Sequence, residues 1–166
     1  EESDFIFLIG TNPKFEATIL NARIRKAYLK NKTKIISLND VGDLTYPYTK
    51  LDGKTDIIKE IINDQHAISP IIKEAKKPLI IFGQSSLSLK SSKYIFESIK
   101  TYLIKNKKIS ENWNSLNTIS DNASTIGSLD LGFYKTIDGS NQVLEDLKNH
   151  KYEVIYLLGQ DNLEFN

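Results

Sequence analysis

Three short apolar runs, each closed by a glycine, limit the folds open to this 166-residue chain. They end at Gly10, Gly83 and Gly159. An apolar run without polar alternation is typical of a strand buried on both faces, as in a parallel sheet. A fourth such run covers residues 34–38. The sequence therefore predicts four strands, with the first central and flanked by the second and third: residues 4–9, 34–38, 79–83 and 152–159.

Between these strands, apolar residues recur at roughly helical spacing. In the first helix the recurring residues are Phe15, Ile19, Ala22, Ile24, Ala27 and Leu29. The predicted helices cover residues 14–31, 55–64, 68–76, 90–105, 120–128 and 140–149. A long loop is expected over 39–54, a turn over 84–86 and a short strand within 113–117. Alternating strands and helices predict an α/β fold: a Rossmann-like, mostly parallel sheet with helices on both faces, formed as a single domain by residues 1–166.

Composition excludes several classes of function. The chain has no cysteine, so cysteine-ligated zinc, iron–sulfur clusters and thiol nucleophiles are absent from it. Two histidines are too few for a histidine metal cluster, and we assign no metal ligand. Lys and Arg number 22 against 21 Asp and Glu, so the net charge is +1 and the chain has no strong electrostatic field that would attract nucleic acid. The apolar runs are far shorter than the roughly 20 residues of a membrane span, so we expect no membrane insertion.

The turn Gly10-Thr11-Asn12-Pro13 is the best candidate for a binding site. Ligands of open α/β sheets bind beyond the carboxyl ends of the strands, where the turns that follow the glycine-closed strands share one rim. Gly10 permits close approach, Thr11 and Asn12 offer hydrogen bonds, and Pro13 fits a first helical turn. A capped strand-to-helix turn with Asn12 as the N-cap explains the same residues, so both interpretations stay open. The G-x-G-x-x-G and Walker fingerprints are absent, and the sequence after Gly83 lacks the last glycine of a serine-hydrolase elbow.

Other polar residues have simpler interpretations. Arg23, Arg25 and Lys26 form either a solvated helix face or an ion-pair anchor to a neighbouring surface. We expect His66 to hydrogen-bond in a loop and Trp113 to be a core or lid residue. No nucleophile and base can be paired by spacing, so we name no catalytic residue. A polar loop, rather than a carboxylate site, is the interpretation of Asp40, Asp43 and Asp52 with their neighbours Tyr46 and Tyr48.

Several blocks of sequence together resemble the large iron–sulfur subunit of respiratory complex I, the 75-kDa subunit, and its bacterial counterpart. They occur in the family's order across most of the chain: residues 8–17, 20–26, 43–48, 73–78 and 128–132. In that family the N-terminal part carries the clusters that relay electrons from NADH toward quinone. The C-terminal part resembles molybdopterin oxidoreductases but has generally lost the cofactor. This chain resembles a segment of that C-terminal part, and the absence of methionine even at position 1 favours an excised fragment.

The resemblance implies a structural or interaction domain of the peripheral-arm subunit of NADH:quinone oxidoreductase. The loop that matches Gly10, Thr11, Asn12 and Pro13 helps bind the pterin guanine dinucleotide in molybdopterin enzymes, and here it is expected as a vestige. No cofactor is expected in this chain, whereas the parent subunit is expected to carry 2Fe–2S and 4Fe–4S clusters. The implied partners are the other peripheral-arm subunits and the cluster-bearing part of the parent chain. The implied location is peripheral to the inner membrane, on the bacterial cytoplasmic side or the mitochondrial matrix side.

Two alternatives stay open. The chain could be a nucleotide-binding Rossmann-like module for molybdopterin guanine dinucleotide or FAD. The FAD alternative comes from residues 75–83, which also resemble the central domain of thiamine-diphosphate enzymes, where such a domain binds a nucleotide. A stand-alone hydrolase is the weaker alternative. We expect the chain by itself to be non-catalytic.

Overall fold

The computed structural model describes residues 1–120, 122, 124–131, 142–154 and 156. The chain divides into two units, Glu1–Ala123 and Ser124–Asn166, which are described separately below. One domain over residues 1–166 stays a prediction.

A five-stranded parallel sheet, in the order β3-β2-β1-β4-β7, organises the first unit. The predicted α/β class and the central position of the first strand are both confirmed. The strand within the expected loop 39–54 was not predicted, because its two exposed residues carry no apolar signal. The strands are β1 (Phe5–Ile9), β2 (Lys34–Ser37), β3 (Thr49–Lys50), β4 (Pro78–Phe82) and β7 (Leu116–Thr118).

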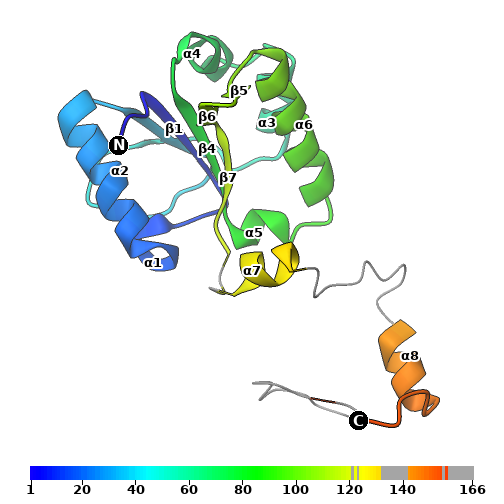
Figure 1. Ribbon diagram of the computed structural model, residues 1–166. Helices are drawn as coiled ribbons and strands as arrows, with labels where there is room; N and C mark the ends of the chain where they lie inside the picture. The colour runs from blue at the N-terminus through cyan, green and yellow to red at the C-terminus, as the bar shows by residue number, and fades with distance from the viewer. Residues whose placement is uncertain (121, 123, 132–141, 155, 157–166) are drawn as a thin grey trace. The chain divides into compact units, whose positions relative to one another are not determined.

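Helices cover both faces of this sheet (Figure 1). Helix α2 packs on one face, and α3, α4 and α6 pack on the other. The expected turn at 84–86 is one turn of helix, α5, and residues 109–114 form a small antiparallel pair. The elements are α1 (Pro13–Glu16), α2 (Thr18–Asn31), α3 (Asp56–Ile62), α4 (Ile68–Glu74), α5 (Gln84–Leu87), α6 (Ser92–Lys105), β5 (Ile109–Ser110) and β6 (Trp113–Asn114).

Strand β1 contributes side chains to two hydrophobic cores, one on each face of the sheet. Phe5, Phe7 and Ile9 pack with the α3, α4 and α6 side, whereas Ile6 and Leu8 pack with the α2 side. All five side chains are at most 1% exposed. Burial of such a side chain contributes about 1.5–3 kcal/mol, which explains why this strand reads as an unbroken apolar run.

The predicted helix 14–31 differs from the structure in two ways. It is interrupted at Ala17, whose backbone is not helical, and its apolar residues do not form one buried stripe. Phe15, Ile19 and Leu29 are 78%, 76% and 58% exposed. Ile19 and Leu29 each lie five residues from the buried Ile24, which is about 140° around a helix of 3.6 residues per turn. They therefore point away from the core.

The second unit contains α7 (Thr125–Asp130) and α8 (Gln142–Lys148), close to the predicted helices 120–128 and 140–149. Of the predicted strand 152–159, residues 152–154 and 156 are not in a strand, and residues 155 and 157–159 lie outside the described residues. Gly159 is among the latter. No helix within the described parts of the chain has the length and apolar character to cross a bilayer.

Candidate functional site

The order in which strands are added reverses between β1 and β4. From β1 the chain adds β2 and β3 on one side, then returns to add β4 and β7 on the other. Open α/β sheets bind ligands at the carboxyl ends of the strands beside such a switch point. Gly10 and Gly83 directly follow these two strands, so the structure confirms that their turns share one rim.

The chain itself fills the space between these two turns. A Cβ atom on Gly83 would lie 2.2 Å from the carbonyl oxygen of Gly10, and one on Gly10 would lie 2.6 Å from Cβ of Ser86. Gly10 also has a φ of +60°, which side chains rarely adopt. The hydroxyl of Ser85 donates to the Gly10 carbonyl (2.6 Å), and that of Ser86 donates to the Ile9 carbonyl (3.1 Å). The glycines thus serve close packing of backbone on backbone.

The turn after β1 is a capped helix start. Asn12 is the N-cap of α1, and its Oδ1 accepts a hydrogen bond from the backbone N–H of Lys14 (3.1 Å). Pro13 is buried at the first helical position, where its missing N–H costs nothing. Thr11 is 3% exposed. The capping interpretation of this turn is therefore confirmed.

The carboxylate of Glu16 accepts hydrogen bonds from two donors of this turn. Its Oε1 accepts from the backbone N–H of Asn12 (2.7 Å), and its Oε2 accepts from the hydroxyl of Thr11 (2.8 Å). The side-chain amide of Asn12 donates to the Val41 carbonyl (2.7 Å). The backbone N–H groups of Phe15 and Glu16 both donate to the Asn12 carbonyl. The carboxylate of Glu16 thus takes the position that a bound anion would take at such a turn.

A shallow pocket of about 380 Å³ lies over this turn. Its charged lining groups are the carboxylates of Glu16 and Asp40, and neither Lys nor Arg is among the lining residues. The pKa of Asp40 is held below its ordinary value by the Gly42 N–H, the Lys50 ammonium and the Tyr48 hydroxyl, in that order, so this carboxylate stays charged. The lining residues are Gly10, Thr11, Asn12, Glu16, Asn39, Asp40, Val41 and Ser85.

These residues do not fit the dinucleotide part of a molybdenum cofactor. Its phosphates are anions that need free N–H groups or cations. Here the hydroxyl of Thr11 and both the backbone N–H and the side-chain amide of Asn12 are already bonded within the chain, and the charges that face the pocket are negative. Of the predicted site residues, Gly10, Thr11 and Asn12 line the pocket, whereas Pro13 is buried beneath the turn. The described residues also hold no group of three or more His, Asp or Glu that could bind a metal.

The acidic loop that follows β2 is structural. Asp43 pairs with Lys14 across the turn (2.9 Å), and Asp40 pairs with Lys50 (3.0 Å). Asp40, Lys50 and Asp52 line a small depression of about 310 Å³. The carboxylates of Asp40 and Asp43 are therefore bound to separate lysines, in agreement with a polar loop.

Residues 43–48 close the α2 side of the sheet. Leu44 is fully buried, and Tyr46 is nearly so. The Tyr46 hydroxyl donates to Oδ1 of Asn21 on α2 (2.7 Å), and the amide of Asn21 donates to the Leu44 carbonyl (3.1 Å). Burial raises the pKa of the Tyr46 hydroxyl, which keeps it protonated as a donor. This sequence block therefore owes its form to packing on α2.

The remaining candidates have local roles. Nδ1 of His66 accepts from the backbone N–H of Ile68 (3.2 Å), as predicted for a loop histidine. Trp113 is half-buried, and its indole N–H donates to the Pro78 carbonyl (2.8 Å). Arg23 and Arg25 are exposed on α2.

Sequence reasoning placed the turn at 84–86 on the rim but missed Glu16, and it missed the bonds of Ser85 and Ser86 to the Gly10 turn. An acidic residue four positions after an N-cap asparagine resembles a capping box, in which the acidic side chain bonds back to the cap N–H. That signal could have identified Glu16. In the sequence the two serines match only an incomplete hydrolase elbow, and their contact with the Gly10 turn depends on the pairing of β1 with β4.

Comparison with known proteins agrees with the resemblance seen in the sequence. The chain is 37% identical to the NADH-ubiquinone oxidoreductase 75 kDa subunit of Reclinomonas americana, over 98% of this chain and 23% of that protein. It is 35% identical to the mitochondrial NADH-ubiquinone oxidoreductase 78 kDa subunit of Candida albicans, over 98% and 21%. A potato protein named NADH dehydrogenase [ubiquinone] iron-sulfur protein 1, mitochondrial, is 29% identical over 100% and 21%.

The chain spans between a fifth and a quarter of the length of these relatives. A family model described as Molybdopterin oxidoreductase matches residues 1–165. With its similarity to the complex I 75-kDa subunits and its α/β fold, the chain belongs to the molybdopterin oxidoreductase family.

Proposed function

We propose that this chain is a structural and interaction domain of the large subunit of an NADH:quinone oxidoreductase, with neither an iron–sulfur cluster nor a molybdenum cofactor of its own. Its partners are the cluster-bearing part of the parent chain and other peripheral-arm subunits. Its place is peripheral to the inner membrane, on the cytoplasmic side in bacteria or the matrix side in mitochondria. The clusters, 2Fe–2S and 4Fe–4S, belong to the rest of the parent subunit.

The bonding of Glu16 to the Gly10–Pro13 turn carries the proposal. In a phosphate-binding turn the backbone N–H and hydroxyl groups face the ligand, but here both are bonded to a carboxylate of the same helix. The serines that follow β4 bond to the carbonyls that end β1, which ties the two halves of the switch point together. We interpret this turn as the vestige of a nucleotide site, kept because it packs the sheet.

The absence of cysteine supports the same conclusion. Iron–sulfur clusters are held mainly by cysteine thiolates, and the chain contains none. Electron transfer in the parent enzyme therefore depends on clusters bound elsewhere, and this domain contributes shape and contact surface.

A ligand screen tests whether the Gly10–Pro13 turn still binds a nucleotide. GDP and FAD are added to the purified chain, and thermal unfolding is followed. We expect no saturable shift. A ligand at 100 times its Kd would stabilise the fold by about 2.7 kcal/mol, and such a shift would instead favour a nucleotide-binding module.

Variants in the assembled enzyme test the structural role. Thr11→Val and Glu16→Gln remove parts of the rim network, whereas Gly83→Val disrupts its packing. We expect Gly83→Val to lower the amount of assembled enzyme, and all three variants to keep the NADH-to-quinone rate per assembled complex. A lower rate per complex for Thr11→Val or Glu16→Gln would place the rim in the chemistry and reject the proposal.

A further inference from the structure

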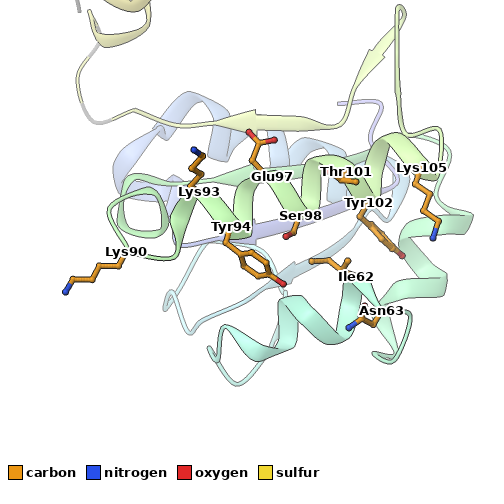
Figure 2. A pocket seen from close by; sticks show the side chains of 10 residues that line it. All are labelled: Ile62, Asn63, Lys90, Lys93, Tyr94, Glu97, Ser98, Thr101, Tyr102 and Lys105. Carbon is orange, nitrogen blue, oxygen red and sulfur yellow. The ribbon is translucent and has the colours of Figure 1, made fainter. Parts of the chain in front are cut away.

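A groove of about 810 Å³ lies between α3 and α6, on the side of the sheet opposite α2. Figure 2 shows Tyr94, Ser98 and Tyr102 on α6 pointing toward α3, where Ile62, the last residue of α3, and Asn63, which follows it, line the opposite side. Three positions spaced by four residues lie on one face of a helix, so the groove runs along α6. It is separate from the rim at the ends of β1 and β4, and no residue lines both.

The floor of this groove is apolar and fixed. Tyr102 is buried, and its hydroxyl contacts Asp64 and the Ser69 carbonyl, both at 3.3 Å. Tyr94, by contrast, is 56% exposed, so a large aromatic ring stands open to a partner beside Ile62. Exposed aromatic rings in a groove are typical anchors for protein partners.

The charges around the groove are mainly positive. Lys90, Lys93 and Lys105 line it, all exposed, and among the described residues none of them forms a salt bridge to a carboxylate. The single lining carboxylate, Glu97, lies 3.9 Å from Lys100, which already offsets its charge. The groove therefore presents three exposed lysines against one lining carboxylate, next to an apolar floor, in a chain whose net charge is only +1. Of the three, Lys105 also helps to lower the pKa of the nearby Asp64 carboxyl.

From this arrangement we propose that the α3–α6 groove docks an acidic, amphipathic segment of a neighbouring polypeptide in the parent enzyme. An apolar side chain of that segment lies against Tyr94 and Ile62, and its Asp and Glu residues face Lys90 and Lys105 toward the two ends of the groove and Lys93 at its edge, on the side of α6 away from α3 (Figure 2). An amphipathic helix laid into a groove is a common mode of such recognition. The inference rests on the proposed interaction role and names the chemistry of the partner.

Site-specific crosslinking tests which molecule occupies the groove. Benzoylphenylalanine replaces Tyr94 in the full-length subunit within its assembled enzyme, and a matched variant carries it at Leu29, exposed on α2. We expect position 94 to yield a peptide adduct rich in Asp and Glu, identified by mass spectrometry. An adduct with a neutral or basic peptide, with a nucleic acid or with lipid would overturn the proposal, as would a yield no higher than at position 29.

Charge reversal tests the role of the lysines. The triple variant Lys90→Glu, Lys93→Glu, Lys105→Glu is compared with Lys30→Glu, Lys54→Glu, Lys76→Glu, three exposed lysines outside the groove. We expect the groove variant to weaken retention of the domain's partner about tenfold at low salt, with the difference from the wild type shrinking at higher salt because salt screens these exposed charges, and the control to change it little. Equal effects of the two variants would refute the docking site.

The two proposals fail differently. If the proposed interaction role is wrong, the enzyme will assemble normally even when Gly83→Val disrupts the fold of this domain. If only the groove proposal is wrong, Gly83→Val will impair assembly, whereas reversing the charge of the three lysines will not.

Discussion

The carboxylate of Glu16 accepts a hydrogen bond from the backbone N–H of Asn12, the residue that caps the helix containing Glu16. Asn12 in turn accepts from the N–H of Lys14. Each residue thus satisfies a donor that the start of a helix leaves unpaired, in the manner of a capping box. A short helix of four residues is stabilised where a nucleotide-binding protein would leave those donors free.

Replacing Glu16 by Ala is expected to lower the free energy of unfolding by about 1 kcal/mol, since two hydrogen bonds to a charged acceptor are lost while one remaining donor is reached by water. Glu16→Gln, which keeps an acceptor, should lose less. Urea denaturation measures both. Glu111→Ala, at an exposed position outside the rim, is the control, and equal losses at positions 16 and 111 would contradict the capping role.

Gly83→Ala is expected to destabilise the chain by about 3 kcal/mol, because its Cβ would lie 2.2 Å from a backbone oxygen that cannot move without shifting β1. Gly127 is the matched control. It lies in α7, and a Cβ added there would have no atom within 4 Å, so Gly127→Ala should be neutral or stabilise that helix by up to about 1 kcal/mol. Thermal unfolding separates the two, and a tolerated Gly83→Ala would show that the turns are not closely packed.

The bond between Tyr46 and Asn21 should couple the 43–48 loop to α2. Tyr46→Phe and Asn21→Ala are each expected to cost about 1–2 kcal/mol, because each leaves a buried polar group without its partner. The double variant should cost about 1 kcal/mol less than the sum of the single variants. Urea denaturation of all four proteins gives this coupling. Strict additivity would mean that the two residues act independently.

The strands were predictable because burial on both faces leaves a continuous apolar run, as in β1 and β4. The exposed apolar side chains of the first helix were not predictable. The break at Ala17 and the packing of Ile24 on the sheet decide which side of the helix is buried, and neither can be read from the spacing of apolar residues. At the rim, Gly10 and Asn12 were identified from the strand-to-helix turn. The contact of Ser85 and Ser86 with that turn arises from strand pairing across 75 residues or more, which local pattern does not report.

Acid should weaken the ion pair between Lys73 on α4 and Asp64, which lies two residues after the end of α3. The Lys73 ammonium, 2.6 Å from Asp64, holds the pKa of that carboxyl below its ordinary value of 3.8. A lowered pKa in the folded state adds stability above the unfolded pKa, and this stability is lost as pH falls through the folded pKa. Below about pH 4, Asp64→Asn should therefore show a shallower fall in the free energy of unfolding than the wild type. Identical slopes in urea titrations at each pH would contradict this.

Alkali should act through Tyr102, whose hydroxyl joins α6 to Asp64 and to the Ser69 carbonyl in α4. Burial, then the nearby Asp64, raises the pKa of its hydroxyl from 10.0 to about 12. Because the protonated form is favoured in the folded state, the associated stability is complete below about pH 10 and is lost as pH rises toward 12. Tyr102→Phe should remove this part of the alkaline loss and also remove one tyrosine from the late step of a tyrosinate absorbance titration. A late step of unchanged size would show that Tyr102 ionises with the exposed tyrosines.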